Sequence, residues 1–413
     1  MAFRAIHFCR LCTGVRLDDI WDLGEQAVAD FPFAQSVITR PVLMVPLRLV
    51  RCVNCGLVQL AYTVDREAMY ENYYYRSGVS KTMREALEGV VYGAMARVEL
   101  RKWDAVLDIG CNDGELLNNY SNHLTRIGID PSNITAAMGR GPIINAGVPP
   151  ILVHNYFSYG AVSQVWRENV KIITSVAMFY DVDRPLDFMA DVADVLHPSG
   201  VWVNQLNYVP SIMENNAFDF ISHEHLTYWD MTLMGDWLAK VGLEIFDVEL
   251  LPLNGGTARF YIQHKGVRPV TKQVSQMREI EKDLRGDGMW RQFRQRIDLN
   301  GEILRNMIEE AKRAGKVVAV LGASTRGNSL LQYYGLGVEQ LPYASDRDPA
   351  KWGRKMVRTD IPIISEEEAR ARKPDYFLVL PYSYIDEIAV REKEYLSNGG
   401  KLIVPLPWAR VVE

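Results

Sequence analysis

The stretch VLDIGCNDGELL, residues 106–117, decides the fold of this chain. Its apolar residues around Asp108 are typical of a buried parallel strand, and Gly110 and Gly114 bracket a short loop from which a helix is expected to begin at Glu115. Glycines let the backbone approach a ligand, and the free N–H groups at a helix start favour a polar or anionic group. The next apolar segment, RIGID, ends in Asp130, about twenty residues after the first strand, where such folds bind ribose hydroxyls.

The glycine spacing argues against one class of cofactor and favours another. The spacing is G-x-x-x-G, which lacks the G-x-G-x-x-G pattern of dinucleotide-binding proteins. Together with the two acidic residues, the loop indicates S-adenosylmethionine, with Asp108 near the amino acid part and Asp130 at the ribose. An ordinary strand–helix turn is the alternative. After the third strand, a polar–aromatic pair can face an adenine ring. The predicted cofactor-binding residues are Asp108, Gly110, Asn112, Asp113, Gly114, Asp130, Asn155 and Tyr156.

Length and charge narrow the class of protein further. A chain of 413 residues exceeds one ordinary core, so two or three domains are expected. The net charge is −5 and there is no long basic run, which argues against a nucleic-acid partner because phosphate neutralisation needs clustered Lys and Arg. We find neither an apolar run of about eighteen residues nor a signal-like N-terminal layout, so we expect a cytoplasmic protein with no membrane partner.

Four of the five cysteines form two C-x-x-C pairs. Cys9, Cys12, Cys52 and Cys55 can place four thiolates tetrahedrally around one zinc ion, and a site closed by four protein ligands is structural because no coordination position stays open. Redox use of a single pair would need a thioredoxin-like βαβ context, which neither has. Unpaired reduced cysteines are the alternative. Residues 1–75 are therefore predicted to form a zinc-binding domain.

From residue 101 to about 265, apolar strands alternate with helices. Five parallel strands with crossover helices, ended by an antiparallel pair, predict an α/β, doubly wound methyl-transfer domain. Beyond the fifth strand lies FDFISHEHLTYWD, residues 218–230, which gathers His223, Glu224, His225 and Tyr228. A histidine oriented by a carboxylate suits general acid/base chemistry. A zinc site through the H-x-H pattern and structural burial of both histidines are the alternatives.

The C-terminal part repeats the opening pattern. A charged helical segment, residues 270–312, leads to KVVAVLGASTRGNSLLQYYG, which contains a second glycine loop from Gly322 to Gly327, and Asp346 follows a further strand. A second nucleotide cofactor is one interpretation of this loop. It also lacks G-x-G-x-x-G, so we favour a smaller α/β domain that holds a substrate against the central domain.

The motifs taken together resemble a known family. The paired C-x-x-C, DIGCNDG, SHEHLTY, NGGTAR at residues 254–259 and GASTRGNSLL resemble the sugar C-methyltransferases of deoxysugar pathways, closest to the tetronitrose C-3′-methyltransferase type. The resemblance covers nearly the whole chain in three regions. It implies a small zinc-binding domain (1–75), a central Rossmann-like class I S-adenosylmethionine domain (76–300) and a smaller C-terminal Rossmann-like α/β domain (301–413). It also implies a nucleotide-linked, dTDP-type 4-keto-deoxysugar between the last two.

The resemblance also implies a reaction. A ketone at C4 acidifies the C3 proton, a base removes it, and C3 of the enolate attacks the methyl group. His225 matches the base position and Glu224 its neighbour, with His223 the competing base and Tyr228 nearby. Departures from the family pattern at Ser222–His223 and at 179–181 bear on which sugar binds. The expected substrate-binding residues are Tyr75, Tyr180, Asn207 and Arg326.

Two other functions stay open at this point. One is a methyltransferase of the same fold that acts on an oxygen or on a non-sugar acceptor. The other is a non-catalytic binding or scaffold protein, against which the intact Asp108, Gly110, Gly114 and Asp130 argue. The partner is expected to be a small molecule, and the chain a monomer or weak homo-oligomer.

Overall fold

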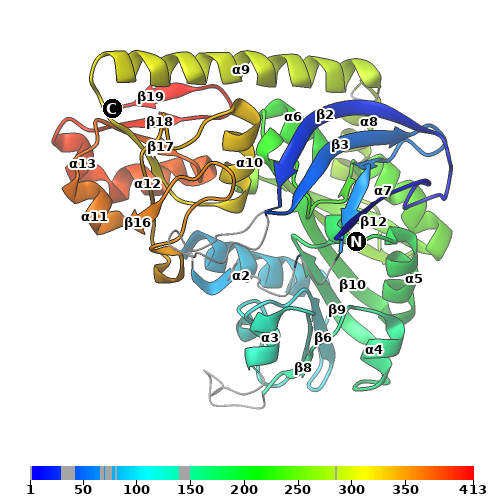
Figure 1. Ribbon diagram of the computed structural model, residues 1–413. Helices are drawn as coiled ribbons and strands as arrows, with labels where there is room; N and C mark the ends of the chain where they lie inside the picture. Colours follow the sequence, from blue (N-terminus) through cyan, green and yellow to red (C-terminus); the bar gives the residue numbers. More distant parts are fainter. Residues whose placement is uncertain are drawn as a thin grey trace.

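A computed structural model describes residues 2–28, 42–65, 69, 77–79, 81–138, 149–283 and 286–413. Within these residues the chain forms one two-stranded sheet and three larger sheets of four, seven and six strands. In Figure 1 the central sheet lies in the lower part of the molecule, the N-terminal strands lie above it at upper right, the C-terminal sheet lies at upper left, and the long helix α9 runs along the top. No helix in this described part is long and apolar enough to span a membrane.

The seven-stranded central sheet has the order β12-β13-β10-β9-β6-β7-β8. Strands β6 to β10 run parallel to one another, β13 pairs antiparallel with β10, and β12 pairs antiparallel with β13. This confirms the predicted doubly wound arrangement with an antiparallel pair at its end. The strands are β6 (Ala105–Ile109), β7 (Thr125–Ile129), β8 (Ile151–Val153), β9 (Val170–Val176), β10 (Leu196–Asn207), β12 (Leu243–Leu251) and β13 (Thr257–His264).

Helices cover this sheet because their apolar faces pack on its buried strands. The α-helices of this part are α2 (Lys81–Met95), α3 (Asn133–Met138), α4 (Tyr159–Ser163), α5 (Pro185–Val195), α6 (Val209–Glu214) and α7 (Met231–Leu238). Short 3-10 turns connect many of them: η1 (Ser77–Val79), η2 (Leu117–Asn119), η3 (Phe179–Asp181), η4 (Phe218–Phe220), η5 (Ala239–Val241) and η6 (Leu253–Gly255).

One expected helix is absent. The prediction that a helix begins at Glu115 is wrong, since the chain there forms only the single turn η2. The sequence after the loop is rich in Asn and Ser, which compete with helical hydrogen bonds. Asn119, for example, donates its side-chain amide to the carbonyl of Glu115 at 3.0 Å. The glycine loop therefore has no long helix N-terminus behind it.

The N-terminal strands complete their sheet with a strand from the central part. The four-stranded sheet has the order β11-β4-β3-β2, and β1 pairs separately with β5. Strand β11 follows the His-Glu-His segment directly, with Thr227 opposite Gln59. The strands are β1 (Phe3–Ala5), β2 (Leu17–Ala27), β3 (Met44–Cys52), β4 (Val58–Leu60), β5 (Tyr62–Val64) and β11 (Thr227–Tyr228).

The C-terminal sheet has the order β16-β15-β14-β17-β18-β19 and is parallel except for β19. Its strands are β14 (Val318–Leu321), β15 (Ala344–Asp346), β16 (Ile363–Ser365), β17 (Tyr376–Val379), β18 (Lys401–Val404) and β19 (Arg410–Val412). The helices of this part are α9 (Asp287–Arg313), α10 (Thr325–Tyr334), α11 (Glu366–Ala371), α12 (Ile385–Arg391) and α13 (Lys393–Ser397), with the turns η7 (Pro349–Lys351) and η8 (Tyr382–Tyr384). Helix α8 (Lys272–Asp283), which precedes them, contacts α7 and β12 of the central part. Helix α9 runs through the predicted boundary between residues 300 and 301.

Aromatic packing joins the N-terminal sheet to the C-terminal part. Trp21 of β2 is fully buried, and its ring centroid lies 5.7 Å from that of Phe293 in α9 and 5.6 Å from that of Tyr333 in α10. Its indole N–H also donates to the Tyr333 hydroxyl at 3.3 Å. Large buried aromatic side chains contribute most to such contacts. The N-terminal sheet is therefore fixed against the C-terminal part.

Candidate active site and metal centre

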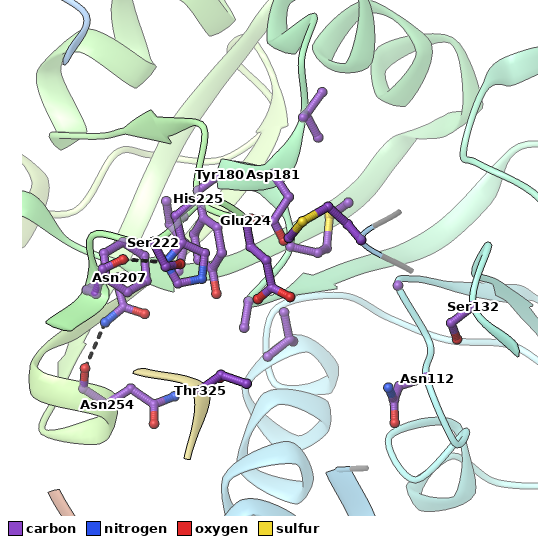
Figure 2. Close-up of a pocket in the computed structure, with 18 of the residues that line it drawn as sticks. Asn112, Ser132, Tyr180, Asp181, Asn207, Ser222, Glu224, His225, Asn254 and Thr325 are labelled. Atoms are coloured by element: carbon purple, nitrogen blue, oxygen red, sulfur yellow. Dashed lines mark hydrogen bonds between the residues drawn. The ribbon is translucent and has the colours of Figure 1, made fainter. Parts of the chain in front are cut away.

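One large cavity lies where the three parts meet. Its volume is about 1220 Å³, and its lining extends from Asp108 and Asp130 in the central sheet to His225 and to Arg326 of the C-terminal part. Pockets for one small ligand usually measure about 300–1,000 Å³. This cavity is therefore large enough for a cofactor and an acceptor side by side. Figure 2 shows Asn112 and Ser132 on one side of it, across from Tyr180, Glu224 and His225.

The glycine loop after β6 is braced by Asp130. One carboxylate oxygen of Asp130 accepts the backbone N–H of Asn112 at 3.0 Å, and the other accepts the N–H of Ser132 at 2.7 Å. Gly110 has φ +76°, and a Cβ there would meet the side chain of Met178 at 3.0 Å. The strand-end Asp and the glycine thus keep the loop open and fixed, as a cofactor cradle requires.

Asp108 is a buried carboxyl group at the floor of the cavity. Thr174 donates its hydroxyl to Asp108 at 2.6 Å, and burial raises the pKa of Asp108 to about 7. An ionised carboxylate in this position would be stabilised by a cationic ligand group. The ammonium group of S-adenosylmethionine meets that requirement, so the residues present fit the predicted cofactor.

The other predicted cofactor residues differ in their contacts and in whether they line the cavity. The Asn112 side chain accepts the N–H of Ser77 at 3.3 Å, and Asp113 accepts that of Gly78 at 2.9 Å, so both hold turn η1 over the loop. Gly114 has φ +73°, which only glycine adopts without strain. Tyr156 lines the cavity, whereas Asn155 is exposed outside its lining and accepts the Tyr156 N–H.

The two histidines of the predicted base segment both line the cavity, but their ring nitrogens are used differently. His225 donates its Nδ1–H to the carbonyl of Phe220, which leaves Nε2 as the unprotonated nitrogen. His223 donates its Nε2–H to the carbonyl of Val45 at 3.0 Å. Burial lowers the pKa of His225 to about 3 and that of His223 to about 4. Both rings are therefore neutral at ordinary pH.

Aromatic rings hold His225 in place. Its ring is stacked on Phe220 with centroids 4.0 Å apart, and the Tyr180 ring approaches it edge-on at 4.4 Å. Tyr180 itself lines the cavity from turn η3. Such fixed orientation is what a general base needs, because proton transfer depends on geometry before pKa.

Two carboxyl groups flank this base. Burial raises the pKa of Glu224 to about 7. Burial also raises the pKa of Asp181 well above its usual range, with a further contribution from the nearby Glu224 charge. Oδ1 of Asp181 is buried without a hydrogen-bond partner. Both residues line the cavity, and their burial there favours the protonated form of each carboxyl group.

The C-terminal part contributes a cation to the same wall. Arg326, the second residue of α10, forms an ion pair with Asp219 at 2.9 Å and donates to the carbonyl of Asn254 at 3.1 Å. Tyr382 donates to the same Asp219 at 2.8 Å. The positive charge of Arg326 also helps to lower the pKa of His225. Asn207 lines this region and donates its side-chain amide to Asn254 at 2.9 Å (Figure 2).

Of the predicted site residues that the structure describes, Asp113, Gly114, Asn155 and Tyr228 do not line the large cavity. Tyr228 is buried in β11 opposite Val58, outside the lining of the large cavity, because the strand that follows the loop turns its side chain away. It lines a separate cavity of about 120 Å³ instead. Tyr75 lies outside the described residues.

The four cysteines of the C-x-x-C pairs converge on one point. Their sulfur atoms all lie within 4.8 Å of one another, with Cys9 and Cys55 3.6 Å apart and Cys12 and Cys52 3.4 Å apart. Four thiolates around a zinc ion at about 2.3 Å stand about 3.8 Å apart, so the cluster matches a tetrahedral site. The residue after each pair, Thr13 and Gly56, has positive φ, which gives the two turns the same geometry.

The second glycine loop has the same brace but a different neighbour. Asp346 accepts the N–H of Ala323 at 3.0 Å and that of Asp348 at 2.9 Å, as Asp130 does in the central part. Lys351, however, places its ammonium group 3.1 Å from Asp346 and 2.9 Å from the Ala323 carbonyl. A side chain of the chain itself thus binds the acidic residue where a ribose would be expected.

Sequence reasoning did not select several residues of the cavity wall. Asp181 directly follows the predicted Tyr180, and its signal is an acidic residue just after the carboxyl end of β9, the edge where such sheets bind ligands. Asp219 and Tyr382 come from segments far apart in the chain, and no local pattern identifies their contact with Arg326.

Three family models match consecutive parts of the chain. Residues 9–70 match a domain described as zinc binding, residues 81–248 match a methyltransferase domain, and residues 252–407 match the C-methyltransferase C-terminal domain. Together they follow the order predicted from the motifs, and they confirm the fold class and the two bound groups, S-adenosylmethionine and zinc.

The chain is also similar to individual proteins. It is 26% identical to the C-methyltransferase NovU from Streptomyces niveus, over 99% of this chain and 97% of that protein. Among solved structures it is similar to the cyclopropane synthase MmaA2 from Mycobacterium tuberculosis (15% identity, 46% of this chain, 89% of that chain, TM-score 0.36). It is likewise similar to an S-adenosylmethionine-dependent methyltransferase from Clostridium acetobutylicum (12% identity, 44% of this chain, 92% of that chain, TM-score 0.36). By its three consecutive family models and its full-length relative, the chain is a methyltransferase, and it is similar throughout to C-methyltransferases such as NovU.

Proposed function

We propose that this enzyme methylates C3 of a nucleotide-linked 4-keto-deoxysugar, of the dTDP type, after His225 has removed the C3 proton. The observation that carries the proposal is the placement of His225. Its Nδ1–H is fixed on the Phe220 carbonyl, its ring is neutral, and it lines the cavity that also contains the cofactor loop. A neutral, oriented imidazole nitrogen beside a carbon acid is what enolate formation requires.

The cofactor half of the cavity is assigned to S-adenosylmethionine, which supplies an electrophilic methyl group when it is bound. Asp108 would accept its ammonium group and Asp130 its ribose hydroxyls, with Gly110 giving the backbone approach and Gly114 the turn behind it. Tyr156 is the candidate for contact with the adenine. Asn155, which is exposed, would contribute only by orienting the Tyr156 backbone.

The acceptor half is assigned to the keto-sugar. Tyr180, Asn207 and Arg326 line it from three different segments, and the charge of Arg326 contributes to lowering the pKa of His225. A positive charge beside the base stabilises negative charge that develops on the C4 oxygen as the proton leaves. Tyr75 stays a predicted substrate residue outside the described part.

The assignment of the base has two competitors on the same segment. His223 uses its Nε2–H to bind the Val45 carbonyl, so only its Nδ1 could accept a proton. Glu224, whose pKa is raised to about 7 by burial, is better matched to neutral pH than a histidine whose pKa is about 3. The geometry favours His225, because the aromatic rings that enclose it fix its orientation.

Hydrogen exchange isolates the proposed step. With S-adenosylhomocysteine and a dTDP-4-keto-deoxysugar in D₂O, the enzyme should exchange the C3 proton for deuterium without methylation. A general base contributes about 10²- to 10⁴-fold, so His225→Asn should slow exchange and methylation by that order while S-adenosylhomocysteine still binds. His223→Asn and Glu224→Gln are the matched controls on the same segment.

The outcomes separate the assignments. Exchange that survives in His225→Asn but is lost in Glu224→Gln identifies the carboxylate as the base, and loss only in His223→Asn moves the role by two residues. Wild-type enzyme that exchanges none of the keto-sugars, yet methylates a hydroxyl group or a non-sugar acceptor, would refute the proposed acceptor chemistry.

A further inference from the structure

Arg10 is a buried cation in the first zinc turn, between the ligands Cys9 and Cys12. Only 7% of it is exposed, so its guanidinium must be satisfied by the protein itself. Its Nη1 donates to the Leu60 carbonyl at 2.6 Å and its Nη2 to the Thr63 hydroxyl at 2.7 Å. These contacts attach the guanidinium to strands β4 and β5.

The remaining donor of Arg10 reaches the wall of the active-site cavity. Its Nε donates to one oxygen of Asp183 at 3.1 Å, while Arg4 donates to the other oxygen at 2.7 Å. Asp183 lies two residues after turn η3, which carries Tyr180, and it lines the cavity itself. The guanidinium therefore connects the zinc turn, strand β4 and the segment that packs on the base.

The same strand also holds the segment that contains the base. Leu60 of β4 donates its N–H to the carbonyl of Leu226 at 2.9 Å, one residue after His225. Thr227 of the paired strand β11 donates its hydroxyl to the carbonyl of Tyr180 at 3.1 Å. Strand β4 is thus the common support of both segments that meet at the base.

We infer that Arg10 is a positioning residue for the reaction: through Asp183 it holds the 179–183 segment on β4, so that the Tyr180 edge stays against the His225 ring. This inference rests on the proposed role of His225. Arg10 itself does not line the cavity. The zinc turn fixes the backbone of Arg10. The metal site therefore supports catalysis through the position of Arg10, although the metal itself takes no part in the reaction.

A purely structural Arg10 would behave differently from a positioning one. Loss of a structural contact lowers stability and affects cofactor binding, zinc content and rate together. Loss of a positioning contact lowers the rate of the proton step alone, since a displacement of about 1 Å near the reacting atoms can cost about 10² in rate. The two roles are therefore separable when binding, metal content and exchange are measured on the same variants.

The test compares Arg10→Gln with Arg4→Gln. Both residues bind Asp183. Arg4 also lines the cavity, but its side chain is 61% exposed whereas that of Arg10 is 2% exposed, so Arg4→Gln is a control at the same partner. For Arg10→Gln we expect about one zinc per chain and S-adenosylhomocysteine affinity within about threefold of wild type. Both C3 exchange and kcat should fall by about 10- to 100-fold. KM should change little, and Arg4→Gln should stay within about threefold in every measurement.

Two further variants keep the inference falsifiable. Asp183→Asn removes the same contact from the other side, so it should show the same rate loss with zinc retained, even if Arg10→Gln does not fold. If Arg10 acts through Asp183, the double variant should be no slower than either single variant. Arg10→Lys should recover part of the rate, because lysine keeps the charge but lacks the planar fork.

Equal effects of Arg4→Gln and Arg10→Gln would overturn the inference, as would a rate loss in Arg10→Gln that only parallels loss of zinc or cofactor affinity. Unchanged exchange in a zinc-replete Arg10→Gln enzyme would overturn it while leaving the proposed function standing. Absence of exchange in the wild-type enzyme would instead refute the proposed function, and with it this role.

Discussion

Replacing Asp130 by alanine should weaken cofactor binding much more than any comparable change in the C-terminal part. Asp130→Ala removes the carboxylate that is assigned to the ribose hydroxyls. A hydrogen bond to a charged group contributes about 1.5–3 kcal/mol. At about 1.4 kcal/mol for each factor of ten, the Kd of S-adenosylhomocysteine should rise about 10- to 150-fold. Isothermal titration calorimetry measures this change directly.

The control is Asp346→Ala, since Asp346 braces its own glycine loop with the same pair of backbone N–H bonds. Both variants lose these two bonds, so their thermal stabilities without ligand should fall by similar amounts. Only Asp130 lines the cavity, whereas Asp346 is bound by Lys351. A rise in Kd in Asp346→Ala that equals the rise in Asp130→Ala, or an unchanged Kd in Asp130→Ala, would refute the assignment.

The remaining predictions concern the metal, the cofactor carboxyl and the C-terminal cation. Wild-type protein should hold about one zinc per chain and Cys52→Ser should lose it; metal analysis showing full zinc in Cys52→Ser would contradict the four-ligand site. Because burial raises the pKa of Asp108 to about 7, the carboxylate is available to a cationic ligand only above that pH, so affinity for S-adenosylmethionine should rise from pH 6 to 8 and then level off. Asp108→Asn should flatten this dependence in calorimetry, and Glu224→Gln should not, although burial also raises the pKa of Glu224 to about 7. Arg326→Gln should slow C3 exchange by about 10-fold or more while S-adenosylhomocysteine affinity is unchanged; equal loss of both would make Arg326 a structural residue.

Local sequence patterns predicted correctly those elements that are formed by residues close together in the sequence. The strand before Asp108 is buried throughout, as its apolar run indicates, and the two C-x-x-C turns carry their ligands at fixed spacing. The same kind of pattern predicted a helix after Gly114, which does not form because Asn and Ser side chains compete for the helical hydrogen bonds. Predictions from local pattern fail where a side chain, rather than the backbone periodicity, takes the hydrogen bond.

Contacts between distant parts of the chain could not be predicted in this way. Strand β11 pairs with β4 across more than 160 residues of sequence, with Thr227 opposite Gln59, and this pairing turns Tyr228 away from the cavity. Arg326 meets Asp219 because two separate domains face each other. The residue types were visible in the sequence, but the register and the facing of domains that bring them together depend on tertiary packing.

The two glycine loops show what turns such a loop into a binding site. Each follows a buried parallel strand, and each is braced by an acidic residue that accepts two backbone N–H groups. They differ in what the carboxylate faces. Asp346 of the C-terminal part binds Lys351, whereas Asp130 of the central part faces a cavity lined by all three parts of the chain. The local sequence therefore determines the glycine loop and its acidic residue, but the cavity beside the loop depends on the zinc-binding sheet and on α10. Since both also hold the walls around His225, separating either part from the central domain should abolish acceptor chemistry before it abolishes the fold of the cofactor loop.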